Sequence, residues 1–121
     1  MLEVPRRSTR EPKNTDFDLT VEGVGRFTFG RRTMGDELAI QREYSNIIQG
    51  VEPSAWLATM AGWLSVFRVL TVRAPDGWNP DEMDPLDEST YANLFKVYTA
   101  LREKEGSFRP GSKVAPQANG A

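Results

Sequence analysis

The sequence predicts an α+β fold that is mostly helical, with an N-terminal β-hairpin followed by three helices. The first observation is that residues 17–29 alternate apolar and polar side chains on either side of a glycine-containing turn. The second is that apolar residues recur later at the spacing of a helix. The three predicted helices cover residues 33–49, 54–72 and 85–105.

The two ends of the chain lack this periodicity and are polar. Residues 1–15 contain four basic residues and two prolines, so we expect a flexible basic arm. Residues 109–121 are rich in Gly, Pro and Ala, and we expect a disordered tail. A single α+β domain is therefore predicted over residues 16–108.

The composition excludes several classes of function. The 121 residues include no Cys and no His, so the chain lacks a thiolate nucleophile, the commonest general base and the commonest metal ligand. The net charge of −2 does not indicate nucleic-acid binding. No acidic or basic residue has a partner at a spacing typical of catalysis. We therefore expect no enzyme activity, no catalytic residues, no cofactor and no metal.

The first predicted element is the hairpin, with Gly23 and Gly25 in its turn. A hairpin alone is marginally stable in water, so its apolar face is expected to rest on helices or on another chain. Phe27 and Phe29 interleave with Arg26 and the arginines that follow, a pattern that also occurs on surfaces that bind single-stranded nucleic acid. Both rings belong to the apolar face, so core packing is the favoured interpretation and no nucleic acid is expected as a partner.

The helix at 33–49 is predicted by a capping box at its start and one apolar face. Thr33 and Asp36 have the capping-box spacing, with Asp in place of the usual Glu or Gln. Gly50 marks the end. The apolar positions are Ile40, Tyr44, Ile47, Ile48 and Val51.

The helix at 54–72 is apolar on two sides. Its bulky face carries Trp56, Leu57, Met60, Trp63, Leu64, Phe67 and Leu70, and its small-residue face carries Ala58, Ala61, Gly62, Ser65, Val69 and Val72. A helix of this kind suits a position between two neighbours. The segment is also long enough to cross a bilayer, but a charged residue within a span, here Arg68, costs about 2.5–3.5 kcal/mol on insertion scales. We therefore predict a buried central helix and no membrane contact.

The connector at 74–87 is acidic and contains three prolines. Its carboxylates lack the spacing of a calcium loop, so a turn-rich connector anchored to the core by Trp78 is predicted. Asp84 is expected to cap the last helix and Pro85 to open it. An apolar stripe defines the inner face of that helix: Tyr91, Leu94, Phe95, Tyr98 and Leu101.

The domain has more apolar surface than a core of its size requires. Three tryptophans and a helix that is apolar on both sides occur within about 90 ordered residues, and excess apolar surface commonly forms an interface. A protein partner or self-association as a homo-oligomer is therefore the favoured class of function.

Two segments resemble a known family. The motifs "APDGW", "DEMD" and "YANLFKVYTALREKE" followed by "FR", together with "RFTFGRRTMGDELAIQREY" nearer the N-terminus, are similar to the tail assembly chaperones of long-tailed bacteriophages and prophages. The similarity covers roughly residues 17–109. It implies a chaperone in the cytoplasm of the bacterial host that binds the tape measure protein and helps recruit tail tube subunits during virion morphogenesis.

The resemblance also implies partner contacts through amphipathic helices. The expected partner-binding residues are Trp56, Met60, Trp63, Phe67, Tyr91, Phe95 and Tyr98, each of which is also a candidate for the core. Two alternatives remain open at this point. One is a structural minor tail or connector protein of a phage or prophage particle, and the other is an unrelated small protein–protein interaction module.

Overall fold

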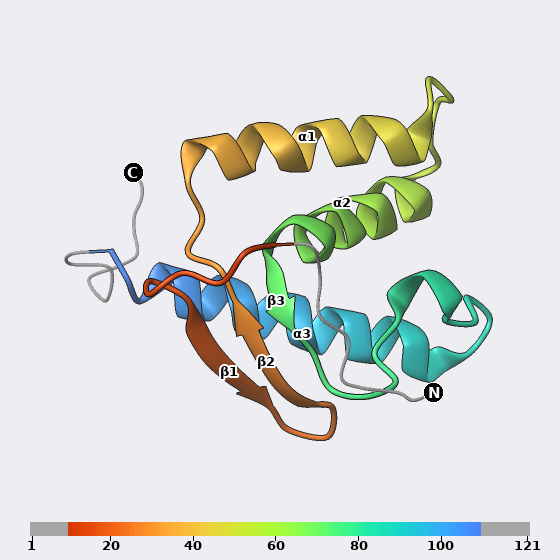
Figure 1. Ribbon diagram of the computed structural model, residues 1–121. Coiled ribbons are helices and arrows are strands. Elements are labelled where there is room, and N and C mark those ends of the chain that lie inside the picture. The colour runs from red at the N-terminus through yellow and green to blue at the C-terminus, as the bar shows by residue number, and fades with distance from the viewer. Residues whose placement is uncertain (1–9, 110–121) are drawn as a thin grey trace.

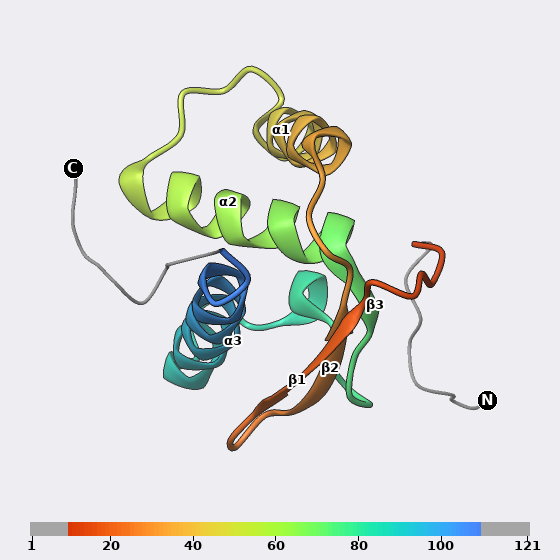
Figure 2. The ribbon, with the colours of Figure 1, turned by 90° about the vertical axis from the view of Figure 1, so that its left-hand side faces the viewer.

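The computed structural model describes residues 10–109 and confirms the α+β class (Figure 1). The elements in chain order are β1 (Phe17–Val21), β2 (Gly25–Phe29), α1 (Met34–Ile48), α2 (Ala55–Leu70), β3 (Thr71–Arg73), the 3₁₀ helix η1 (Pro80–Glu82) and α3 (Glu88–Gly106). The strands form one antiparallel sheet in the order β1-β2-β3. Figure 2 shows that α1 lies on one side of α2, while α3 and the sheet lie on the other.

Most of the predicted basic arm and tail falls on residues 1–9 and 110–121, outside the described part of the chain. Arg10, at the inner end of the predicted arm, contacts the domain. Its guanidinium donates hydrogen bonds to the Asp36 carboxylate at 2.9 and 3.2 Å and to the Val69 carbonyl at 3.2 Å. This side chain therefore links the start of α1 to the last turn of α2.

The hairpin forms as predicted, and its apolar face belongs to the core. Phe17 pairs with Phe29 and Leu19 with Phe27 across the two strands. Phe27 and Phe29 are fully buried and their rings stack at a centroid distance of 5.5 Å. Core packing therefore accounts for both rings.

The sheet has a third strand that the sequence did not predict. The helix predicted to end at residue 72 ends at Leu70, and Thr71–Arg73 pairs with β2. The junction is held by the Gly30 N–H, which donates to the Leu70 carbonyl at 2.8 Å. Because β2 offers an open edge and Thr71 and Val72 are β-branched, the chain gains ladder hydrogen bonds by leaving the helix here.

The starts of the helices were predicted with mixed success. The capping box of α1 is present: the Asp36 N–H donates to Thr33 Oγ1 at 3.1 Å, and the Thr33 N–H donates to the Asp36 carboxylate at 2.9 Å. For α3 the predicted start was wrong, because Asp87 and not Asp84 is the N-cap. Asp84 instead accepts a hydrogen bond from the Leu86 N–H, so the residues after it form a turn before the helix begins.

The core lies between α2, the sheet and α3. From the bulky face of α2, Phe67 and Leu70 are buried in this core. Val97 and Leu101 of α3 are buried in it as well. Trp78 anchors the connector as predicted, with its ring edge-on to Phe27 at 5.0 Å and to Phe67 at 5.8 Å. The same side of α2 thus serves the sheet, the connector and α3.

The small-residue side of α2 faces α1. Ser65 is buried there and its hydroxyl donates to the Ala61 carbonyl at 2.6 Å, so a polar side chain is accommodated without an unpaired donor. Arg68 reaches Glu43 of α1 at 3.2 Å. In the described part of the chain, no helix has the length and hydropathy of a membrane span.

Candidate protein-binding site

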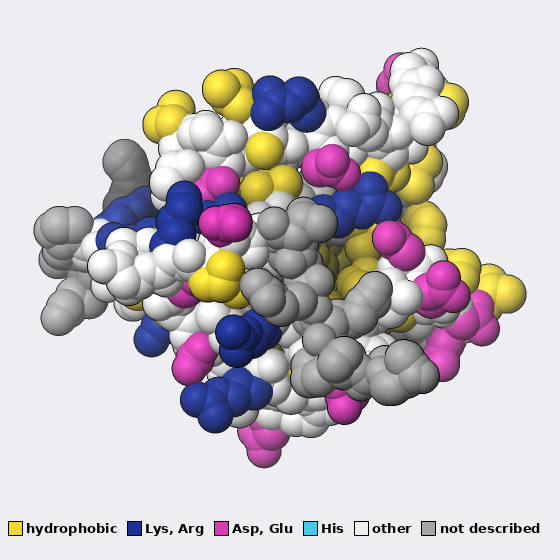
Figure 3. Space-filling model, viewed as in Figure 1, with side chains coloured by type: hydrophobic (Ala, Val, Ile, Leu, Met, Phe, Trp, Pro, Cys, Tyr) yellow, Lys and Arg dark blue, Asp and Glu magenta, His cyan; other side chains and the backbone are white. Residues whose placement is uncertain are grey.

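An apolar groove lies where the first half of α2 meets the connector and the start of α3. Its volume is about 290 Å³. The groove, as the term is used below, is lined by Ile47, Trp56, Leu57, Met60, Ala61, Leu64, Pro80, Asp81, Met83, Pro85, Thr90 and Leu94. Asp81 is the sole charged residue of this lining. Figure 3 shows hydrophobic side chains gathered over this part of the molecule.

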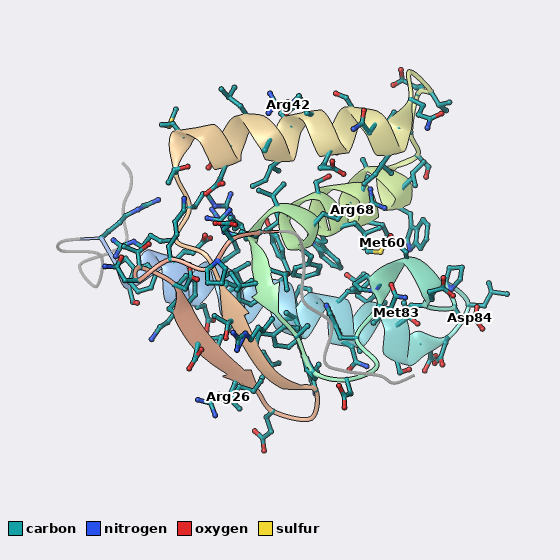
Figure 4. All side chains as sticks on the ribbon, viewed as in Figure 1. Arg26, Arg42, Met60, Arg68, Met83 and Asp84 are labelled. Carbon is teal, nitrogen blue, oxygen red and sulfur yellow. The ribbon has the colours of Figure 1, made fainter. Side chains whose placement is uncertain are left out.

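Local sequence explains how the walls of the groove arise. Ser54 caps α2 by accepting from the Leu57 N–H at 3.1 Å, which places Trp56 in the first turn of the helix. Trp56 is 52% exposed at the edge of the groove, whereas Met60, one turn later, is buried at its base. Met83 enters from the connector, and Figure 4 shows it across from Met60.

Next to the groove, four aromatic side chains surround the α2–α3 crossing. The Trp63 ring lies 5.5 Å from the ring of Tyr91, 5.9 Å from that of Phe95 and 5.6 Å from that of Tyr98, measured between centroids. Tyr91 and Phe95 stack at 6.1 Å, and each is 49% exposed. We call Trp63, Tyr91, Phe95 and Tyr98 the aromatic cluster.

The structure divides the seven predicted partner-binding residues into two groups. Met60, Trp63 and Phe67 are buried, and Tyr98 is half-buried against Trp63 and Phe67. Trp56, Tyr91 and Phe95 present about half of their surface to solvent. The exposed three are the side chains that another chain can reach, and the buried Trp63 contacts two of them, Tyr91 and Phe95.

Carboxylates stand around the groove. Asp81 forms an ion pair with Arg68 at 2.8 Å, and this hydrogen bond, together with Glu43, holds the pKa of Arg68 above its ordinary value. The backbone N–H and the hydroxyl of Ser89 donate to Asp87 and lower the pKa of that carboxyl. The groove is therefore apolar inside, its one charged lining residue is paired with Arg68, and exposed carboxylates lie in the adjoining chain segment.

Sequence reasoning missed several residues of the groove. Met83 and Pro85 lie in the acidic connector, where no periodicity marks them, and Ile47 was assigned only to the inner face of α1. The signal shared by Met83 and Pro85 was the presence of apolar side chains among carboxylates. The exposed Leu86, next to Pro85, carries the same signal.

A second hollow of about 630 Å³ lies at the opposite end of α3 and is rich in arginine. Two of its four arginines, Arg32 and Arg102, form ion pairs with Glu37 and Glu105. Glu105 accepts from both Nε and an Nη of Arg32 at 3.0 Å and from Arg102 at 2.7 Å. Arg31 lies over the Phe108 ring at 4.3 Å. Arg32 thus links the start of α1 to the end of α3, Arg31 lies on Phe108 just beyond α3, and the Arg102 pair lies within α3.

The groove and the exposed aromatic side chains beside it form a surface that another protein can contact.

Within residues 10–109, no group of three or more His, Cys, Asp or Glu side chains is placed to hold a metal ion. Comparison with protein-family models, with curated proteins and with solved structures gives no significant match.

Proposed function

We propose that this chain is a phage tail assembly chaperone that binds the tape measure protein in the bacterial cytoplasm and helps recruit tail tube subunits. The resemblance of "RFTFGRRTMGDELAIQREY" and of the segment from "APDGW" to "FR" to that family motivates the assignment. The observation that carries the binding role is the groove, with half-exposed Trp56, Tyr91 and Phe95 at and beside it. An apolar helix of a partner is the natural occupant of such a surface.

The size of the exposed aromatic surface favours reversible binding. Three half-exposed aromatic side chains offer on the order of 300 Å² for burial, because each such side chain buries roughly 150–250 Å² when fully covered. At about 25 cal/mol per Å² this burial is worth about 7 kcal/mol. Association itself costs about 4–15 kcal/mol, so one copy binds weakly. A chaperone that must leave as the tail tube assembles requires contacts of this strength.

Co-expression with the tape measure protein from the same gene neighbourhood tests the proposal. We expect the tape measure protein to become soluble and to co-purify with the wild-type chain. The triple variant Trp56→Ser, Tyr91→Ser, Phe95→Ser is expected to lose co-purification. The matched control Met34→Ser, Leu38→Ser removes exposed apolar side chains from the outer side of α1 and is expected to retain it. An insoluble tape measure protein in the presence of a folded wild-type chain would contradict the proposal.

The alternatives make different predictions about the finished particle. A minor tail or connector protein stays in the virion, whereas a chaperone leaves. Mass spectrometry of purified virions or tails is therefore expected to lack this chain, and its presence in stoichiometric amount would favour the structural role. A gene neighbourhood without a tail tube gene and a long tape measure gene would instead favour an unrelated interaction module.

A further inference from the structure

The connector and the start of α3, which form one side of the groove, are acidic. Between residues 74 and 95 there is no Lys or Arg. The same segment contains Asp76, Asp81, Glu82, Asp84, Asp87 and Glu88. It supplies six of the lining residues of the groove: Pro80, Asp81, Met83, Pro85, Thr90 and Leu94. From residue 80 to residue 88, acidic side chains therefore alternate along the chain with residues that line the groove.

Few of these charges are compensated within the molecule. Among residues 10–109, Asp81 is the only one of the six that forms an ion pair, with Arg68. Glu82, Asp84 and Glu88 are exposed. Figure 3 shows acidic side chains beside the hydrophobic ones at this end of the molecule, and Figure 4 places Asp84 at the outer edge of the connector.

We propose that the groove binds an amphipathic helix whose apolar face is flanked by Lys or Arg. The inference deepens the proposed function and rests on it for the location of the site, since both use the groove. The apolar lining takes up the apolar face of the helix, and Trp56 covers it from the side. The carboxylates at the rim meet the flanking basic side chains and fix the orientation in which the helix binds.

Charge complementarity also disfavours two other occupants. A second copy bound through the same surface would bring two acidic rims together, and like charges across an interface cost free energy. Nucleic acid carries phosphates, which the same carboxylates repel. A basic amphipathic segment of another protein meets both requirements of the surface, since it is apolar at the centre and positive at the edge.

Two synthetic helical peptides of about 18 residues, or five turns, test the inference with the full-length chain. They share one apolar face, and its flanking positions carry Lys in one peptide and Glu in the other. Calorimetry is expected to show about tenfold tighter binding of the Lys peptide at low salt. Because the Debye length falls from about 10 Å at 0.1 M to 3 Å at 1 M salt, this preference is expected to shrink at high salt.

Two triple variants identify the carboxylates responsible. Glu82→Gln, Asp84→Asn, Glu88→Gln is expected to bind both peptides with nearly equal affinity. The matched control Glu11→Gln, Glu22→Gln, Glu103→Gln removes three exposed carboxylates elsewhere and is expected to keep the preference. Circular dichroism checks that both variants fold.

Equal affinity of the wild-type chain for the two peptides, or binding of neither, would overturn the inference. The outcome is separable from that of the proposed function. If the tape measure protein co-purifies but the Lys peptide is not preferred, only the charge selection fails. If the Lys peptide is preferred but no tape measure protein co-purifies, the charge selection stands and the phage assignment fails.

Discussion

Trp63 joins the core to the candidate binding surface. The residue is only 9% exposed, and its ring contacts three rings of α3. Trp56, two turns earlier on the same helix, is half-exposed at the edge of the groove. Two tryptophans on one helix face therefore differ in environment: Trp63 belongs to the core, whereas Trp56 is accessible to another chain.

Substitution of the two tryptophans is expected to separate these roles. Trp63→Ala is expected to lower the free energy of unfolding by about 3–5 kcal/mol, because it removes a large buried ring and leaves a cavity. Trp56→Ala is expected to cost much less stability and to weaken partner binding. Urea denaturation of both variants checks the difference, and similar losses of stability would show that Trp56 is also a core residue.

Asp36 connects the capping box of α1 to Arg10. Burial raises the pKa of its carboxyl, but the hydrogen bonds from Arg10 and Thr33 outweigh burial, and the net effect lowers the pKa below its ordinary value of 3.8. A carboxyl with a depressed pKa stabilises the folded state fully above the ordinary pKa. This stabilisation is lost as the pH falls through the lower pKa of the folded state.

We therefore expect Asp36→Asn to destabilise the protein by about 1–3 kcal/mol at pH 7, since it weakens charge-assisted hydrogen bonds. The difference from wild type is expected to begin to shrink as the pH falls below about 4, where the carboxyl of the unfolded chain takes up a proton, and to be lost through the lower pKa of the folded state. Urea midpoints measured from pH 7 to pH 2 check this. Glu103→Gln serves as the control, and a gap for Asp36→Asn that stays constant with pH would contradict the assignment.

The exposure of individual residues was predictable only in part. The spacing of Tyr91, Leu94 and Phe95 identified one apolar stripe, yet Leu94 is buried while the two aromatic residues remain half-exposed. The spacing of apolar residues shows which side of α3 is apolar. How many residues of that side α2 covers depends on the angle at which the two helices cross. That crossing is set by contacts distant in sequence.

At the scale of elements, local signals were reliable where the interaction is local. The Thr33–Asp36 box was identified because both partners lie within one turn. β3 was missed because its stability comes from β2, more than 40 residues earlier in the chain. Its β-branched residues were equally compatible with the end of a helix, so only the open edge of β2 decides the outcome.

The start of α3 provides a test at this scale. Asp87 caps the helix through the Ser89 N–H, whereas Asp84 caps only a turn. We expect Asp87→Ala to lower the urea midpoint measurably and Asp84→Ala to lower it less, because the former leaves a helix N–H group without its protein acceptor. A larger effect of Asp84→Ala would place the functional cap at the position that the sequence indicated.

At the scale of the whole molecule, the candidate site is a product of the layering. Its walls come from the end of α1, the first half of α2, the connector and the start of α3, so no single segment contains the groove. The apolar surplus was predictable from composition, but its location required the packing of these segments. Four of the seven predicted partner-binding residues, Met60, Trp63, Phe67 and Tyr98, support the surface from within or beside the core.

We expect α1, the outer layer of the molecule, to unfold locally before the other helices. Ile48 is the only buried residue of α1, whereas α2 has seven, and ion pairs to Arg10, Arg32 and Arg68 supply much of the remaining attachment. Elements with few buried apolar contacts open at a lower free energy than the global unfolding. We therefore expect the amide hydrogens of α1 to exchange faster than those of α2 and of the buried face of α3.

Hydrogen exchange followed by mass spectrometry at two salt concentrations measures this order. Salt weakens ion pairs that are exposed to solvent, as the pairs that attach α1 are in part. Raising the salt is therefore expected to speed exchange in α1 more than in α2. Glu43→Gln, which removes the carboxylate that binds Arg68 from α1, is expected to have the same effect at low salt. Uniform protection across α1 and α2 would show that the two helices open as one unit, and that the small-residue face of α2 is reached only by global unfolding.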